Sequence, residues 1–242
     1  MKPISISQVE SLVNAKQNFC DCYLVSSLSA IANNKKGKEI LRKNILTDGD
    51  AFCVKFNDVY GKEEQYLVKQ KECNDLILTD KYLEVVPLTK PHNPIVKAVE
   101  VAMTKLLKQH FFKKNILSRA IKCNEIFEYN KPSDFMKMLT GIKPVTLNES
   151  TLSNTMKNKK ESTFQLLDRI SEEKEKTFIA GTGFKFIPTR ITSWHCYNIK
   201  EIDAKNRIVM LYDNKQQTNI RTTYDDIANK FKFICGYFDN MF

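Results

Sequence analysis

The chain has 242 residues, of which 42% are apolar, and its formal net charge is +10. This length and apolar content exclude a wholly disordered chain and allow a full core, in one large domain or in two lobes around a cleft. The lysines are dispersed, without interleaved aromatic residues or a zinc-finger or RNP-type motif, so we expect a solvated basic surface and no nucleic-acid partner.

Cysteine usage and hydropathy limit the possible compartments. The seven cysteines are an odd number and form no CxxC pair, which predicts reduced thiols in a cytosol-like compartment and no zinc site. No window approaches the roughly 18 uninterrupted apolar residues of a membrane span, and the N-terminus lacks the apolar region of a signal peptide. We therefore expect a soluble protein with no membrane span and no Sec-type signal.

The first predicted helix follows the stretch QNFCDCYLVSSL, residues 17–28. It begins at Asp21 or Cys22, and Asn33, Asn34 and Gly37 end it. Its apolar residues have the spacing of a helix with one buried face: Leu24, Val25, Leu28, Ile31 and Ala32. Alternating apolar residues in 52–56 and 65–70 then predict a small β-hairpin.

A second helix is predicted from Pro94, capped by Asn93, to about Phe112, with lysines such as Lys97 on its outer face. Residues 147–163 are polar and aperiodic, which favours an exposed loop. A capping-box pattern at Ser162 and Gln165 then predicts a helix start. The rest is strand-rich, with expected strands in 177–183, 194–202, 207–214 and 232–238.

Cys22 has the sequence context of a reactive thiol. A helix N-terminus or a neighbouring imidazolium lowers a thiol pKa enough to populate the thiolate near neutrality. The chain has three histidines to supply a base. His92 lies in a proline-flanked loop and His110 ends a lysine-rich helix, so both suit a surface position, whereas His195 opens a predicted strand.

The partner of His195 depends on the register of the following hairpin. If residues 203–206 form the loop symmetrically, His195 lies opposite Asn214, with both side chains on one face. Asn214 would then orient the imidazole, and Asp213 would point to the other face. A slip of one residue would reverse this choice, and an ordinary hairpin with a half-buried histidine remains the alternative.

These segments together resemble the protease core of the calpain family, which are papain-like cysteine proteases. QNFCDCYLVSSLSAIA is similar to the family's Gln-(Gly)-x-x-Gly-Asp-Cys-Trp-Leu-Leu-Ala-Ala motif, HCYNI to His-Ala-Tyr-x-Val, and Asp213-Asn214 falls at its Arg-Asn-Pro-Trp-Gly. Weaker similarities in 94–107, 133–142 and 222–238 extend the resemblance over nearly the whole chain. The chain departs from the family at Cys20, which replaces a glycine, and at 215–217, which replace Pro-Trp-Gly.

The resemblance implies an α+β, papain-like fold with a helical lobe in residues 1–143 and a β-rich lobe in 144–242. It also implies a cysteine endopeptidase in which Cys22 is the nucleophile, His195 the base and Asn214 the residue that holds the imidazole. Gln17 and the Cys22 backbone N–H would stabilise the oxyanion. The same acyl-enzyme chemistry would also serve a deamidase or transamidase acting on protein glutamine, and a non-catalytic interaction module is the remaining alternative.

The expected partner is a protein substrate, and we expect a monomer. No cofactor is expected. Calcium binding is not excluded, although the only short acidic segment that could form a calcium loop, LTDGDAF at 46–52, is more typical of a plain turn. Such a protein would act in its own cytoplasm or, after secretion by a non-Sec route, in the cytosol of a host cell.

Overall fold

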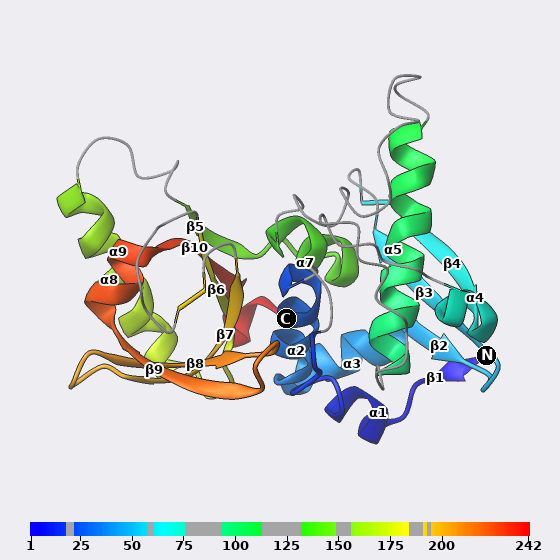
Figure 1. Cartoon of the computed structure of the whole chain (residues 1–242), viewed down its shortest axis with the longest axis horizontal. Helices are drawn as coiled ribbons and strands as arrows, with labels where there is room; N and C mark the ends of the chain where they lie inside the picture. The colour runs from blue at the N-terminus through cyan, green and yellow to red at the C-terminus, as the bar shows by residue number, and fades with distance from the viewer. Residues whose placement is uncertain are drawn as a thin grey trace.

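The computed structural model describes residues 1–17, 22–57, 61–75, 93–112, 132–148, 156–183, 191–192 and 195–242. Helices and two antiparallel sheets give an α+β protein (Figure 1). The helices are α1 (Ile6–Glu10), α2 (Cys22–Ala32), α3 (Lys35–Asn44), α4 (Gln70–Asp75), α5 (Pro94–Phe112), α7 (Pro132–Thr140), α8 (Met156–Glu172), α9 (Tyr224–Lys230) and the 3₁₀ turn Asp239–Met241. The strands are β1 (Lys2–Pro3), β2 (Ile45–Thr47), β3 (Ala51–Asn57), β4 (Glu63–Lys69), β5 (Val145–Asn148), β6 (Thr177–Thr182), β7 (Cys196–Asp203), β8 (Ile208–Asp213), β9 (Thr218–Thr223) and β10 (Phe231–Tyr237).

Helix α2 is the central element of the fold and lies between the two sheets (Figure 1). Its predicted start at Cys22 is confirmed, but the expectation of a single buried face is wrong, because every residue from Tyr23 to Ala32 is buried. Burial of the serines is possible because their hydroxyls find carbonyl acceptors. Ser27 donates to the Tyr23 carbonyl at 2.6 Å, and Ser26 to the Cys196 carbonyl at 3.1 Å.

Helix α3 was not predicted, and Gly37 does not end α2 as expected. The chain turns at Asn34, whose side chain caps α3 by accepting from the backbone of Lys36 and Gly37. Gly37 instead lets the two helices approach closely. A Cβ at this position would lie 2.1 Å from the Ile31 carbonyl oxygen, a distance that no side chain tolerates.

The first sheet has the strand order β1-β2-β3-β4 and contains the predicted hairpin as β3 and β4. Helix α5 runs beside it from the predicted cap, with Asn93 Oδ1 accepting from the Ile95 N–H at 2.9 Å. The expectation for Lys97 is wrong: it is buried, and its Nζ donates to the Cys73 carbonyl at 3.0 Å. Its aliphatic carbons are therefore buried on a face of the helix that the sequence pattern had placed in solvent.

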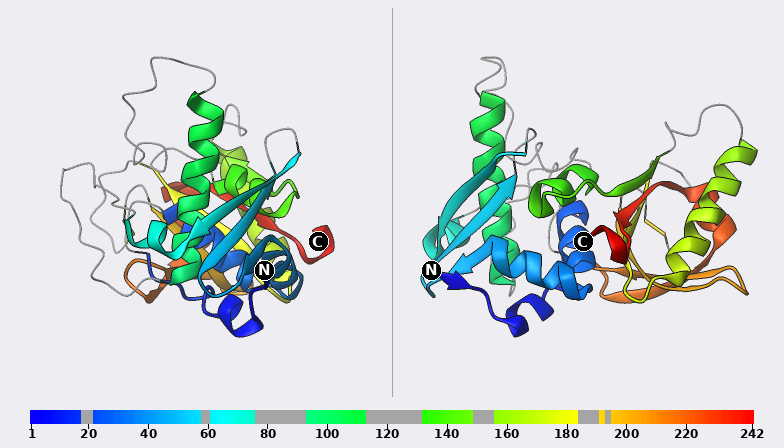
Figure 2. Two further views of the ribbon diagram at one scale, coloured as in Figure 1. Left: turned by 90° about the vertical axis from the view of Figure 1, so that its right-hand side faces the viewer. Right: turned by 180° about the vertical axis from the view of Figure 1, so that it is seen from behind.

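The second sheet has the order β5-β10-β6-β7-β8-β9. Helix α8 packs on it through Leu167 and Ile170, on the side away from α2 (Figures 1 and 2). The predicted loop over 147–163 is wrong at both ends, because β5 continues to Asn148 and this helix begins at Met156. The predicted helix start at the Ser162 capping box is wrong for the same reason, since Ser162 lies inside the helix. Its lysine-rich first turns carry little apolar periodicity, and Asn158, Lys160 and Glu161 are exposed there.

The N-terminus lies at the outer edge of the first sheet, while the C-terminus returns to the middle of the molecule near α2 (Figure 2). The strands of the first sheet all precede residue 70, and those of the second all follow residue 144. Among the described helices, none has the length and apolar content needed to cross a membrane.

We expect Gly37→Ala to lower the free energy of unfolding by about 1–3 kcal/mol, because the new methyl group collides with the α2 backbone. At an unconstrained helix position the same change would stabilise by up to about 1 kcal/mol. Denaturant titration shows whether the free energy of unfolding falls or rises. Lys43→Ala, at an exposed site of the same helix, is the control and should change stability by less than about 0.5 kcal/mol; a stabilised Gly37→Ala protein would contradict the close approach.

Candidate active site

The structure brings Cys22 and His195 together across the interface of α2 and β7. Cys22 is half-buried at the first residue of α2, where backbone N–H groups lack intrahelical acceptors. His195 directly precedes β7 and is buried, with 4% of its surface exposed. Its backbone is fixed to Thr182, because the His195 N–H donates to Thr182 Oγ1 at 3.0 Å and the Thr182 N–H donates to the His195 carbonyl at 2.9 Å.

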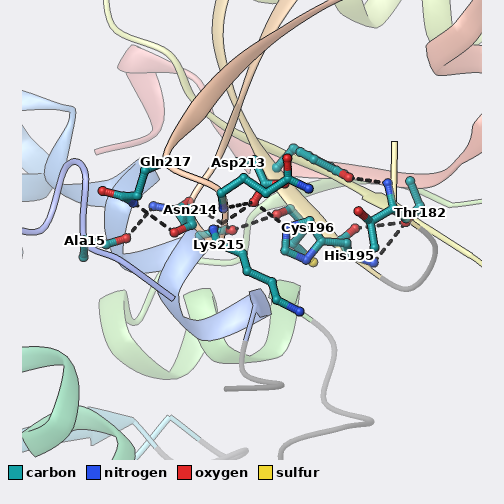
Figure 3. Close-up of polar contacts among 12 residues, drawn as sticks. Ala15, Thr182, His195, Cys196, Asp213, Asn214, Lys215 and Gln217 are labelled. Atoms are coloured by element: carbon teal, nitrogen blue, oxygen red, sulfur yellow. Dashed lines mark hydrogen bonds and ion pairs between the residues drawn. The ribbon is translucent and has the colours of Figure 1, made fainter. Parts of the chain in front are cut away.

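The residue that orients the imidazole is Asp213, and the expectation for Asn214 is wrong. Nε2 of His195 lies 2.9 Å from Oδ1 of Asp213 (Figure 3). The same oxygen accepts the backbone N–H groups of Lys215 at 2.8 Å and Gln216 at 3.1 Å, which fixes the carboxylate. Since Asp213 occupies Nε2, Nδ1 is the ring nitrogen left for the Cys22 thiol.

A β-bulge explains why the symmetric register fails. The loop comprises residues 204–207, because Asp203 pairs with Ile208. The register then shifts between Ile199 and Glu201, and beyond this point Asn198 pairs with Tyr212. Continued by one residue, this pairing sets Asp213 opposite Tyr197, and alternation places the His195 side chain on the same face. Accordingly, the His195 and Tyr197 rings meet edge to face, with centroids 4.7 Å apart.

The site favours a protonated imidazole. Burial opposes the charge on His195, but hydrogen bonds and charge from Asp213 and Cys22 outweigh it and raise the pKa of His195 to about 9. Burial also opposes ionisation of Asp213. The His195 hydrogen bond and the two backbone N–H groups nevertheless hold the pKa of Asp213 below its usual value. The pair is therefore an imidazolium held by a carboxylate.

Cys196 is a functional neighbour that the sequence analysis missed. Its thiol hydrogen-bonds to Cys22 and holds the pKa of Cys22 well below the ordinary thiol value. Burial opposes this effect, and the hydrogen bond and charge of His195 reinforce it. The contact with Cys22 and complete burial raise the pKa of Cys196, which favours the protonated form of this thiol. Its position directly after His195, where the resembled motif has alanine, was the available signal.

Asn214 faces Ala15, away from His195 (Figure 3), and Gln17 is hydrogen-bonded to it. Asn214 is fully buried, and its Nδ2 donates to the Ala15 carbonyl at 2.9 Å. Gln17 is also buried, and its backbone N–H donates to the Asn214 carbonyl at 2.9 Å. The structure thus brings Gln17 and Asn214 to the same place but keeps Asn214 off the imidazole. Cys20 and Asp21 lie outside the described residues.

Within the described ranges, no group of three or more His, Cys, Asp and Glu side chains is arranged to hold a metal ion. In the acidic segment at 46–52, Asp48 Oδ1 accepts the backbone N–H groups of Asp50 at 3.2 Å and Ala51 at 3.0 Å. Gly49 there has a φ of 104°, which glycine adopts readily. These contacts form a turn before β3.

Chemically, the site unites a thiol of lowered pKa at a helix N-terminus, an imidazolium in contact with it, and a carboxylate that holds the imidazolium. Such an arrangement can generate a nucleophilic thiolate and supply a proton next to it. A scan against models of known protein families finds none that matches the chain, and a search of curated proteins finds no match either.

We expect Asp213→Asn to lower the pKa of His195 from about 9, because an amide cannot supply the charge that favours the imidazolium. NMR titration of the imidazole measures this shift. Asn214→Ala is the matched neighbour and should leave the His195 pKa unchanged, since Asn214 makes no hydrogen bond to the ring. If Asn214→Ala produced the larger shift, the register described above would be incorrect.

We expect Cys196→Ala to raise the pKa of Cys22, because it removes the thiol donor that stabilises the thiolate. The pH dependence of iodoacetamide alkylation at Cys22, followed by mass spectrometry, should move to higher pH. Cys53→Ala removes a half-exposed thiol on β3 and should leave the Cys22 profile in place. An unmoved profile in Cys196→Ala would assign the lowered pKa to His195 and the helix N-terminus alone.

Proposed function

We propose that the protein is a cysteine endopeptidase that uses Cys22, His195 and Asp213 on a calpain-like, papain-type fold. The observation that carries the proposal is the buried His195–Asp213 pair set against a thiol of lowered pKa at the start of α2. Each component has a role that peptide cleavage requires, namely a nucleophile, a proton carrier and a group that orients the carrier.

In the proposed reaction the Cys22 thiolate attacks the carbonyl carbon of a peptide bond. The carbonyl oxygen becomes an oxyanion, for which the Cys22 backbone N–H and the Gln17 side chain are the proposed donors. The C–N bond breaks as His195 gives its proton to the leaving amine, which leaves a thioester on Cys22. A water molecule then loses a proton to His195 and attacks the thioester, releasing the carboxylate and restoring the thiolate.

Asp213 supports both halves of this cycle. Its carboxylate keeps the ring oriented through Nε2, so that Nδ1 faces the thiol when the proton moves. Its charge also favours the imidazolium, which must be present when the amine leaves. An asparagine, the residue implied by the family resemblance, would orient the ring without this charge. The chain thus performs the proposed chemistry with a carboxylate in the third position.

The arrangement of elements supports the papain-type part of the proposal. The nucleophile starts a helix buried between two sheets, and the histidine enters a strand packed on that helix. The proposed lobes, residues 1–143 and 144–242, each contain one of the two sheets. A protein substrate and action in a reduced compartment belong to the same proposal.

We expect Cys22→Ala to abolish both cleavage of a peptide library and labelling by a cysteine-directed epoxide, because it removes the nucleophilic sulfur. Cys20→Ala is the matched control two residues away and should keep the label and most of the activity. Mass spectrometry locates both the cleavages and the labelled residue.

The same experiment separates the alternatives. Conversion of glutamine side chains with release of ammonia and without chain cleavage would indicate a deamidase or transamidase. Absence of both reactions together with an unlabelled Cys22 would favour a non-catalytic interaction module. Cleavage that survives in Cys22→Ala would contradict the proposed mechanism.

A further inference from the structure

Asn214 joins two segments that are distant in the sequence. Its Nδ2 donates to the Ala15 carbonyl at 2.9 Å, and its own carbonyl accepts the Gln17 N–H at 2.9 Å. The same carbonyl also accepts from Nε2 of Gln217 at 2.9 Å. Oδ1 lies 3.4 Å from Ser26 Oγ and shares the single hydroxyl proton of Ser26 with the nearer Cys196 carbonyl. Asn214 therefore connects the end of β8 both to the segment that precedes α2 and to α2 itself.

The side chains of the adjacent residues Asp213 and Asn214 point in opposite directions. Asp213 faces His195, whereas Asn214 faces Ala15 (Figure 3). Both are fully enclosed, with exposures of 1% and 0%. A buried amide retains its hydrogen-bond partners because leaving them unpaired costs about 1–3 kcal/mol. Through the bond from Nδ2 to the Ala15 carbonyl, this cost makes the position of the segment before α2 depend on the Asn214 side chain.

We propose that Asn214 is a positioning residue that holds the segment carrying Gln17 in place for oxyanion stabilisation, and that it does not act on the imidazole. The inference rests on the proposed function, because it assigns Gln17 the role of an oxyanion donor. Oxyanion stabilisation depends on donors fixed before the reaction begins. Hydrogen bonds to the backbone at both Ala15 and Gln17 restrict the translation and rotation of this segment.

A double-mutant cycle in kcat tests the coupling between the two residues. Loss of an oxyanion donor lowers kcat by about 10²–10³-fold, so we expect Gln17→Ala to fall in this range. Asn214→Ala should lower kcat by about 10-fold or more, with KM changed by less than about threefold. Because Asn214 acts through Gln17, the double variant should be no slower than Gln17→Ala within about threefold. If the fold-decrease in kcat of the double variant were the product of the two single decreases, the proposal would be overturned.

Alkylation of Cys22 by iodoacetamide supplies the readout that separates positioning from action on the imidazole. This reaction develops no oxyanion, so Asn214→Ala should keep the wild-type rate and pH profile. Asp213→Asn is the positive control, because it alters the charge beside His195. A shifted profile in Asn214→Ala would place its action on the imidazole and overturn the proposal. If Asn214→Ala does not fold, Asn214→Ser gives the same test, since its hydroxyl is too short to reach the Ala15 carbonyl.

Failure of the proposed function would be recognised separately. The wild-type protein could be alkylated at Cys22 and still cleave no peptide. In that case the double-mutant cycle of Gln17 and Asn214 is measured with the dissociation constant of a peptide aldehyde in place of kcat. The aldehyde forms a hemithioacetal with Cys22 that presents an equivalent oxygen to the same donors. If Gln17→Ala and Asn214→Ala each weaken binding of the aldehyde, and the double variant binds it no more weakly than Gln17→Ala, the positioning role of Asn214 is supported without peptide cleavage. If the two losses in aldehyde binding free energy add in the double variant, the positioning role is overturned.

Discussion

The hydrogen bond between His195 Nε2 and Asp213 Oδ1, 2.9 Å long, is the interaction on which the site depends. Both side chains are buried, and a buried charge costs several kcal/mol unless it is paired and hydrogen-bonded. Two backbone N–H groups complete the environment of Oδ1. The carboxylate therefore remains ionised, and its charge favours the imidazolium that in turn stabilises a thiolate on Cys22.

The rest of the fold serves to bring these groups together. Residues Tyr23 to Ala32 of helix α2 are buried, so the position of Cys22 is determined by packing of α2 against β6 and β7 of the second sheet and against α3 and α7. Ser26 extends this constraint, because its hydroxyl donates to the Cys196 carbonyl and its own carbonyl accepts from Asn198 Nδ2 at 3.0 Å. The helix that holds the thiol is thus hydrogen-bonded to the strand that follows the histidine. A shift of α2 relative to β7 would break these bonds and separate Cys22 from His195.

Local signals were sufficient for much of the fold and for part of the site. The caps and spacing around Cys22 and Asn93 predicted two helices, and apolar alternation predicted the β3–β4 hairpin and the main strands of the second sheet. Cys22 and His195 were identified because their residue types and flanking patterns are local. The shorter helices α1, α4, α7 and α9 were not predicted, and neither were α3 and the start of α8, whose lysine-rich sequences contain few apolar residues.

The third member of the site could not be predicted from local patterns. Its identity depends on a loop shifted to residues 204–207, with Arg207 at a φ of 53°, and on a bulge at Lys200. Neither position has the glycine that often signals such geometry. The bulge residue instead makes long-range contacts, since Lys200 Nζ reaches the Val13 carbonyl at 3.4 Å and lies 5.2 Å from the centre of the Tyr212 ring. Tertiary contacts of this kind leave no trace in the sequence of a single strand.

Activation of Cys22 can be measured as the ultraviolet absorbance of its thiolate as a function of pH, taken as the difference between wild type and Cys22→Ala. We expect a thiolate step well below the ordinary thiol pKa of 9.0, because Cys196, His195 and the helix N-terminus all favour the anion. A single step at or above 9.0 would show that Cys22 is an ordinary thiol and that the His195–Asp213 pair does not activate it.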